Sequence, residues 1–458
     1  MSMIFEKVSL DFILKKALFC VKLLAIGVDN MENISDTALK RSRIMYIFEA
    51  AFEYLISILV AGSFLATLTK ELGFSDSLTG ILSSIISLGC LFQLTAVFLN
   101  RKRLKSTIII LSIVNQVLFA LLYVIPFLNF SKSTKTIIFV FAIITAYIIY
   151  NMVHPKKISW LMSVVDFEKR GGFTAKKEMI SLVFGMIFSY IMGSVVDHFK
   201  AEGKIKTAFI ICGFVIFTLM VLHTLTMLFT VEKQQIQKNK VPIIQTIKKV
   251  FNNKKILSVA ALTVIYYISN YSITPFLGTY KINELGFSLQ FVSLLTILSS
   301  ASRFLVSIPW GKYADKTSFA KMIEKCFIFL AFSYLFIVFS SPTNGKIMLA
   351  CFYIMHGISM GGLNSALMNL IFDYAPIEIR ADSLAVCQAG AGVVGFFTTL
   401  LFSPVISAVQ NNGNKIFGVQ VYAQQILATV ALLLSVFAVF YVRKFLIKKD
   451  LIRLLKFP

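Results

Sequence analysis

The sequence is poor in charged residues. Only 15% of its 458 residues are charged, and 57% are hydrophobic. An ordinary soluble protein carries about 25% charged residues, which cover the surface that faces water. The shortage of charge therefore excludes an ordinary soluble protein and favours a chain that is surrounded by lipid.

Acidic residues are especially scarce, with 22 Asp and Glu against 45 Lys and Arg. Such a basic balance can indicate a nucleic-acid partner. Here, however, the basic residues gather in short breaks between long apolar runs, as they do in loops held at one face of a membrane. We therefore predict contact with the lipid bilayer and no nucleic-acid partner.

Motifs of enzyme and metal chemistry are also lacking. The six cysteines are scattered, and none forms a C-x-x-C pair or a Cys/His pattern suited to zinc. The chain contains neither an H-E-x-x-H motif nor a G-x-x-x-x-G-K-[ST] phosphate loop. We expect no catalytic residue, no cofactor and no metal, and hence a protein that is not an enzyme.

Long apolar runs are abundant. A membrane-crossing helix needs roughly 20 mostly apolar residues, and twelve such runs predict an all-α polytopic membrane protein. The fourth run is interrupted by polar residues between Asn151 and Lys157, before Trp160 restarts it. The runs are 45–69, 78–100, 106–128, 136–158, 178–197, 207–230, 257–280, 288–309, 322–341, 347–371, 382–408 and 421–441.

The basic residues also predict an orientation. If both termini face the cytoplasm, 35 of the 45 Lys and Arg lie on the cytoplasmic side and nine on the other, with Arg303 inside a span. We therefore predict a multi-pass protein of the cell (inner or plasma) membrane with both termini in the cytoplasm.

The chain contains an internal repeat. Glu-Leu-Gly-Phe-Ser occurs at 71–75 and again at 284–288, an offset of 213 residues. A lysine-rich break separates the two sets of six spans, which predicts two pseudo-symmetric six-helix bundles with a solute site between them. The predicted divisions are an amphipathic N-terminal segment 1–44, a first bundle 45–230, a linker 231–256, a second bundle 257–441 and a basic tail 442–458.

The residues Pro309-Trp-Gly-Lys-Tyr-Ala-Asp-Lys-Thr-Ser318 between the eighth and ninth spans resemble the signature cytoplasmic loop of the major facilitator superfamily. The resemblance implies that Gly311 permits close helix approach and that Asp315 and Lys316 act in a cytoplasmic gate. The corresponding first-half loop 100–105 lacks both Gly and Asp. The resemblance also implies a monomeric secondary transporter that moves a small solute by alternating access.

Charged side chains within the spans are candidates for ion coupling, because a charge inside the bilayer is costly. Glu49 and Glu53 are one helical turn apart and would share a proton, which favours protons as the coupling ion. Alternatively, Glu49 lies at the wet membrane edge and Glu53 has a structural partner. We expect Arg303 to hold an anionic group of the solute, or to pair with Glu53, or to stabilise one gate state.

Uncharged polar side chains in the spans are candidates for the solute cavity. They are Gln93, Gln116, Asn151, Tyr267, Asn270, Tyr271, His356 and Asn364. A packing role is the alternative for each of them, His356 above all. Two other functions also fit the same fold: a non-transporting sensor or assembly partner, and a lipid translocator.

Overall fold

The computed structural model describes residues 35–93, 104–166, 170–232, 248, 250–375 and 380–447. Most of the predicted N-terminal segment and of the linker lies outside these residues. So do positions 100–103 of the first-half loop and the tail from 448 onward.

The first half of the chain folds into helices that begin at side-chain caps. Ser35, Ser75 and Ser131 each accept a hydrogen bond from the backbone N–H three residues on, which satisfies a free donor at the helix start. The helices are α2 (Asp36–Leu59), α3 (Gly62–Glu71), α4 (Asp76–Gly89), α5 (Leu104–Leu122), η2 (Ile125–Phe127), α6 (Lys132–Met162), α7 (Arg170–Ala201) and α8 (Ile205–Leu228).

The second half repeats this order and adds a short hairpin. Ser288 caps α12 in the same way as Ser75 caps α4, and these two serines end the two copies of the repeat. The elements are α10 (Lys254–Ile273), η4 (Thr274–Phe276), α11 (Leu277–Thr279), η5 (Tyr280–Glu284), α12 (Leu289–Lys316), α13 (Phe319–Val338), α14 (Gly345–Tyr374), α15 (Arg380–Asn411), β1 (Lys415–Ile416), β2 (Val419–Gln420), α16 (Ala423–Val442) and η7 (Arg443–Ile447).

The predicted all-α membrane fold is confirmed. In the described residues, ten helices are long and apolar enough to cross a membrane, and α2 with α3, bent by 40°, make an eleventh span. The twelfth, α13, has 20 residues but carries Lys321, Glu324 and Lys325 in its first two turns. Each of the twelve predicted runs thus corresponds to a helix.

The expected interruption of the fourth run is wrong. α6 continues through Pro155 to Met162, so Lys157 lies inside the helix and is only 2% exposed. The polar residues look like a break in the sequence, but the structure keeps all of them in the helix and buries Asn151 and Lys157. Removing Lys157 from the cytoplasmic set leaves 34 basic residues there, and the predicted orientation does not change.

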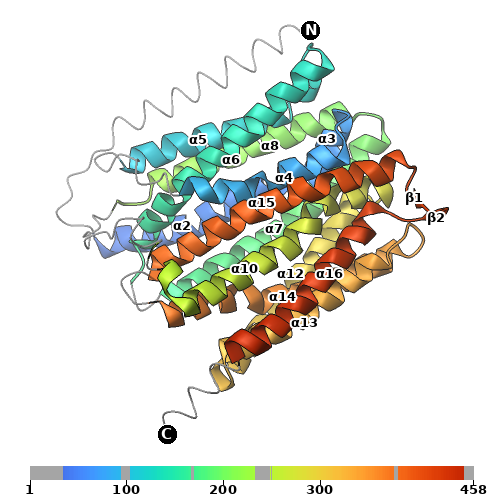
Figure 1. Cartoon of the computed structure of the whole chain (residues 1–458). Helices are drawn as coiled ribbons and strands as arrows, with labels where there is room; N and C mark the ends of the chain where they lie inside the picture. Colours follow the sequence, from blue (N-terminus) through green and yellow to red (C-terminus); the bar gives the residue numbers. More distant parts are fainter. Residues whose placement is uncertain are drawn as a thin grey trace.

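The two halves lie side by side (Figure 1). α4 packs against α15, and α7 packs against α12, so these two pairs of helices make the largest contacts between the halves. We call the end of the molecule that carries α3 and the β1–β2 hairpin the α3 end. The opposite end, where α2 begins and α16 finishes, is the termini end.

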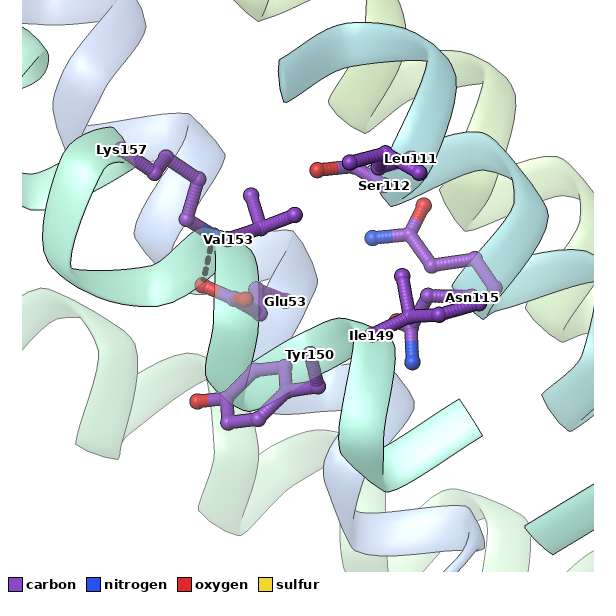
Figure 2. A pocket seen from close by; sticks show the side chains of 9 residues that line it. Glu53, Leu111, Ser112, Asn115, Ile149, Tyr150, Val153 and Lys157 are labelled. Carbon is purple, nitrogen blue, oxygen red and sulfur yellow. Dashed lines mark ion pairs between the residues drawn. The ribbon is translucent and has the colours of Figure 1, made fainter. Parts of the chain in front are cut away.

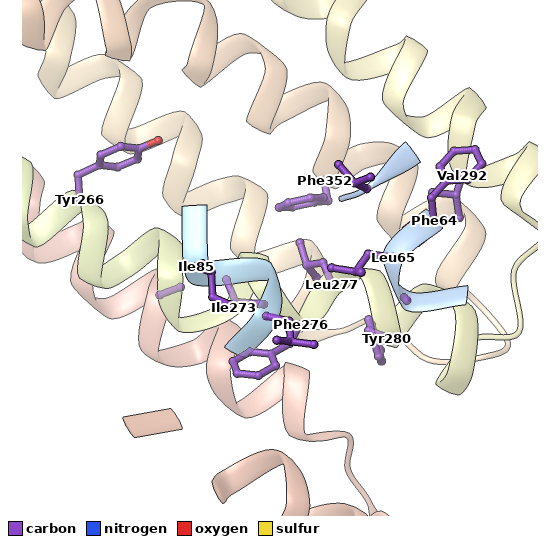
Figure 3. Packing of buried hydrophobic residues seen from close by; sticks show 14 of the residues in the cluster. Phe64, Leu65, Ile85, Tyr266, Ile273, Phe276, Leu277, Tyr280, Val292 and Phe352 are labelled. Atoms are coloured by element: carbon purple, nitrogen blue, oxygen red, sulfur yellow. The ribbon is translucent and has the colours of Figure 1, made fainter. Parts of the chain in front are cut away.

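The halves meet closely at the α3 end. A Cβ atom on Gly278 of α11 would lie 2.7 Å from the Gly62 carbonyl oxygen, so the two backbones are in direct contact. Buried apolar side chains fill the surrounding space, and Leu65 of α3 faces Leu277 of α11 (Figure 3). This apolar contact excludes water and closes the α3 end.

Candidate functional site

The interior of the first half contains a cluster of ionisable side chains. The Lys157 ammonium lies 2.8 Å from a Glu49 carboxylate oxygen and 2.6 Å from one of Glu53. His223 lies on the other side of Glu49, with its Nε2 atom 3.1 Å from the same oxygen. We call Glu49, Glu53, Lys157 and His223 the ionic cluster.

Helix geometry brings the ionic cluster together. Glu49 and Glu53 lie one turn apart on α2, so both point to the same side and reach one lysine on α6. His223 comes from α8, and its Nδ1 atom lies 3.1 Å from the Gln116 amide nitrogen on α5. Four helices of one half therefore share one hydrogen-bonded network.

A small pocket opens beside this cluster (Figure 2). Its empty space is about 230 Å³, a volume that includes space open to solvent. Glu53 is 20% exposed, whereas Glu49 is 1% exposed. The pocket therefore suits water and gives Glu53 a path to it. Its lining residues are Glu53, Leu111, Ser112, Asn115, Gln116, Ile149, Tyr150, Val153 and Lys157.

The charges of the ionic cluster do not balance. With both carboxylates ionised and His223 neutral, two negative charges face one ammonium. Buried charges are stable only when they are paired, so the cluster has a place for one additional proton. Ligand atoms of Glu49, Glu53 and His223 also lie within 4.8 Å of one another, a spacing that suits a metal ion. In this conformation the Lys157 ammonium lies between the two carboxylates.

Sequence reasoning missed two members of the ionic cluster. Lys157 was assigned to a break, and His223 lies in an almost wholly apolar run. The signal for Lys157 is the continuity of α6. A helix that runs unbroken through Asn151 also contains Lys157, six residues further along. No pattern in the sequence marks His223, because its role depends on the packing of α8 against α2.

Arg303 lies apart from the ionic cluster. It is half-buried on α12, where its carbonyl accepts a hydrogen bond from the Ser307 hydroxyl. In the part of the chain that the structure describes, no ion pair joins Arg303 to a carboxylate. The expected pairing of Arg303 with Glu53 is not formed, because Glu53 binds Lys157 instead.

The tyrosines of α10 line the interface between the halves. The rings of Tyr267 and Tyr271 stack with centroids 5.5 Å apart. The carbonyl of Tyr271 accepts a hydrogen bond from the Thr399 hydroxyl of α15 at 2.9 Å, and its ring lies near Ser87 of α4, where the two halves meet. Asn270, one of the three cavity candidates on α10, accepts a hydrogen bond from the Thr274 hydroxyl.

The remaining cavity candidates fall into two groups. In the first half, Gln93 donates to Asn151, and Asn151 donates back to a carbonyl of its own helix, so these two amides hold α4 against α6. In the second half, Asn364 is exposed and His356 packs at 5.2 Å on the Phe352 ring. The structure therefore does not gather all eight candidates at one point.

The gate residues implied by the family signature lie at the termini end. Gly311 is exposed, and a Cβ atom there would meet nothing within 4 Å. Asp315 and Lys316 are also exposed, in the last turn of α12. In this conformation Gly311 therefore makes no close helix contact with the residues that the structure describes.

Hydrogen bonds between the halves gather at the α3 end. Asp76 of the first half accepts from Asn283 at 2.6 Å and from Gln410 at 2.8 Å. Asp197 accepts from the backbone N–H groups of Leu289 and Gln290 at the start of α12. At the termini end, no hydrogen bond or ion pair joins a described residue of one half to a described residue of the other.

Known structures with this arrangement are membrane transporters. The chain resembles the nucleoside transporter NupG (TM-score 0.63, 11% identity, covering 89% of this chain and 98% of that one). It also resembles the POT family transporter PepTSo (TM-score 0.64, 12% identity, 88% and 98%). A D-xylose–proton symporter is similar as well (TM-score 0.61, 13% identity, 87% and 96%). At these identities the likeness shows the fold alone.

The sequence itself matches the model of the Major Facilitator Superfamily over residues 46–399. The chain therefore belongs to this family of membrane transporters, which carry small solutes across a bilayer. No curated protein matches the sequence.

Proposed function

We propose that this chain is a secondary active transporter in which protons drive a small solute by alternating access. The observation that supports proton coupling most directly is the ionic cluster, in which two carboxylates share one buried lysine. A proton on Glu53 neutralises the excess negative charge and frees the Lys157 ammonium from one of its two partners. Protonation therefore changes how α2 is held against α6.

The contacts between the halves support the alternating-access part of the proposal. The halves are joined by apolar packing and hydrogen bonds at the α3 end, while Gly311 of α12 makes no close contact with described residues at the other end. This is the arrangement of a transporter closed on one side. The opposite state would close Gly311 and Asp315 against the first half.

We further propose that the chain is a monomer in the cell membrane, with the α3 end outside and both termini in the cytoplasm. The distribution of Lys and Arg supports this orientation. Single cysteines at exposed Val419 and Lys316, in a background without other cysteines, test it. A membrane-impermeant maleimide added to intact cells should label the first position and not the second.

The coupling proposal is tested by Glu53→Gln. Sugars, amino acids, short peptides, organic acids, nucleosides and cations are first screened for thermal stabilisation of the purified protein. A stabilising solute is then followed into proteoliposomes with and without a pH gradient. Wild-type protein should accumulate it against its gradient, whereas Glu53→Gln should exchange it without accumulation. Glu178→Gln, at an exposed carboxylate of α7, is the matched control. Accumulation by the wild type that ignores the pH gradient contradicts the proposal.

A further inference from the structure

Arg303 is a cation without a counter-charge. Placing a guanidinium inside a membrane costs at least a few kcal/mol unless a partner is present. Within the described ranges, Arg303 has no carboxylate partner, and Glu53, the acid predicted for it, is bound to Lys157. The partner of Arg303 must therefore be sought outside the set of protein carboxylates that the structure describes.

Arg303 packs with its backbone against Gly361 of α14, and three other polar side chains lie within electrostatic reach of its guanidinium. The guanidinium is near enough for its charge to act on Tyr54 of the first half, and on Tyr266 and His356 of the second half. These residues lie on α2, α10 and α14 respectively. Arg303 lies on α12, which packs against α7 of the first half and α14 of the second, at the interface where a solute would meet both halves.

These neighbours carry hydrogen-bond donors with weak acceptors or none. The Tyr266 hydroxyl donates to the Met360 sulfur at 3.3 Å, and a thioether is a weak acceptor. The hydroxyl of Tyr54 and the ring nitrogens of His356 make no hydrogen bond with other residues that the structure describes. A positive charge surrounded by spare donors is suited to a ligand that is rich in acceptors and negatively charged.

The charge balance sets how negative the ligand is, and this step rests on the proposed proton coupling. With one proton on Glu53, the ionic cluster is neutral, because the charges of Glu49 and Lys157 cancel. Arg303 then contributes a single positive charge. One negative charge on the solute compensates it, and transport of that solute with one proton moves no net charge.

We propose that the solute is a small organic monoanion whose carboxylate binds Arg303. The planar guanidinium donates two parallel hydrogen bonds to a carboxylate, which gives both strength and orientation. Tyr54 and Tyr266 donate to the remaining lone pairs. Because these groups come from both halves, the bound anion connects the halves across the cavity.

Thermal stabilisation of the full-length protein tests the ligand class. The probes are acetate, lactate and benzoate, their neutral amides, and glycerol 3-phosphate as a dianion. At least one carboxylate should stabilise the wild type, and its amide should not. Arg303→Gln should weaken that carboxylate about 30-fold or more, as expected when one member of a buried charge pair is removed. Lys312→Gln, at an exposed position of the same helix, should bind as the wild type does.

A second variant guards against misfolding. Arg303→Lys keeps the charge but loses the fork of donors, so it should bind more weakly than the wild type and more tightly than Arg303→Gln.

The proposal is overturned if no carboxylate stabilises the protein, if an amide binds as well as its acid, or if both variants bind as the wild type. Glu53→Gln separates the two proposals. A neutral solute with pH-driven uptake that Glu53→Gln abolishes refutes the anion site alone. Carboxylate binding with uptake that ignores the pH gradient refutes the coupling alone.

Discussion

The ionic cluster of the first half contrasts with the equivalent part of the second half. The 213-residue repeat places Leu262 at the position of Glu49 and Leu370 at the position of Lys157. Both leucines are buried, at 0% and 3% exposure. The same pair of helices thus holds an ion pair in one half and an apolar contact in the other.

The exchange also runs in the opposite direction. Arg303 of the second half corresponds to Cys90 of the first half, and Tyr266 corresponds to Glu53. Each half therefore places ionisable groups at positions where the other has uncharged ones. The shared fold is compatible with either choice. Under the proposed function, the first half would handle protons and the second half a charge on the solute.

The largest effect should come from breaking the ion pair itself. Lys157→Met leaves Glu49 buried without its partner, and such losses cost about 3–5 kcal/mol. Leu370→Met at the equivalent position of the second half should cost less than about 1.5 kcal/mol. Thermal unfolding of the two variants in detergent measures the difference. Equal melting temperatures would show that breaking the ion pair destabilises the protein no more than changing the apolar contact does.

A smaller effect is expected at the closed end. Gly278→Ala places a methyl group against the Gly62 carbonyl, and overpacking of this kind costs roughly 1–3 kcal/mol. The variant should therefore favour conformations in which the α3 end is open. Spin labels at exposed Phe130 and Val419, one in each half, report the distance across that end. The distance should lengthen in Gly278→Ala.

Gly311→Ala is the matched control for the closed end, because its added methyl group meets nothing within 4 Å. The same pair of labels should report an unchanged distance in this variant. If both glycine variants gave the same distance distribution, the contact between Gly278 and Gly62 would not determine closure.

The smallest effects are expected from the exposed ion pairs at the termini end. Each half has one: Arg43 with Asp166 at 2.9 Å, and Arg443 with Glu324 at 2.7 Å. Exposed pairs of this kind contribute roughly 0–1 kcal/mol. Arg43→Gln and Arg443→Gln should each change the melting temperature by no more than a few degrees. A larger loss in only one would reveal a further asymmetry between the halves.

Much of the fold could be predicted from the sequence because lipid imposes a simple rule. A chain that crosses a bilayer must form apolar helices of a set length, and the twelve runs satisfied it. The rule fails at α6, where Pro155 and Lys157 resemble a loop. The burial of Lys157 depends on its pairing with Glu49 and Glu53, which lie far earlier in the chain.

The site could be predicted only in part. Glu49 and Glu53 stand out because carboxylates are rare in apolar runs, and Arg303 stands out for the same reason. Which of them pair is a matter of helix packing, so a composition argument could not assign Lys157 to the glutamates. His223 could not be found at all, since a single histidine in an apolar helix has many roles.

The contacts at the α3 end have a consequence for how this transporter is built. Asp197 contacts Leu289, and the residues 213 positions away from each, Gln410 and Asp76, contact one another. A contact made once from i to j and again from j to i is the mark of an isologous interface between identical subunits. The closed end therefore has the geometry of a two-fold dimer of six-helix chains, now fused into one. These two contacts differ in chemistry but occupy equivalent places. If one of them is lost, the other still holds the two halves together in the closed state.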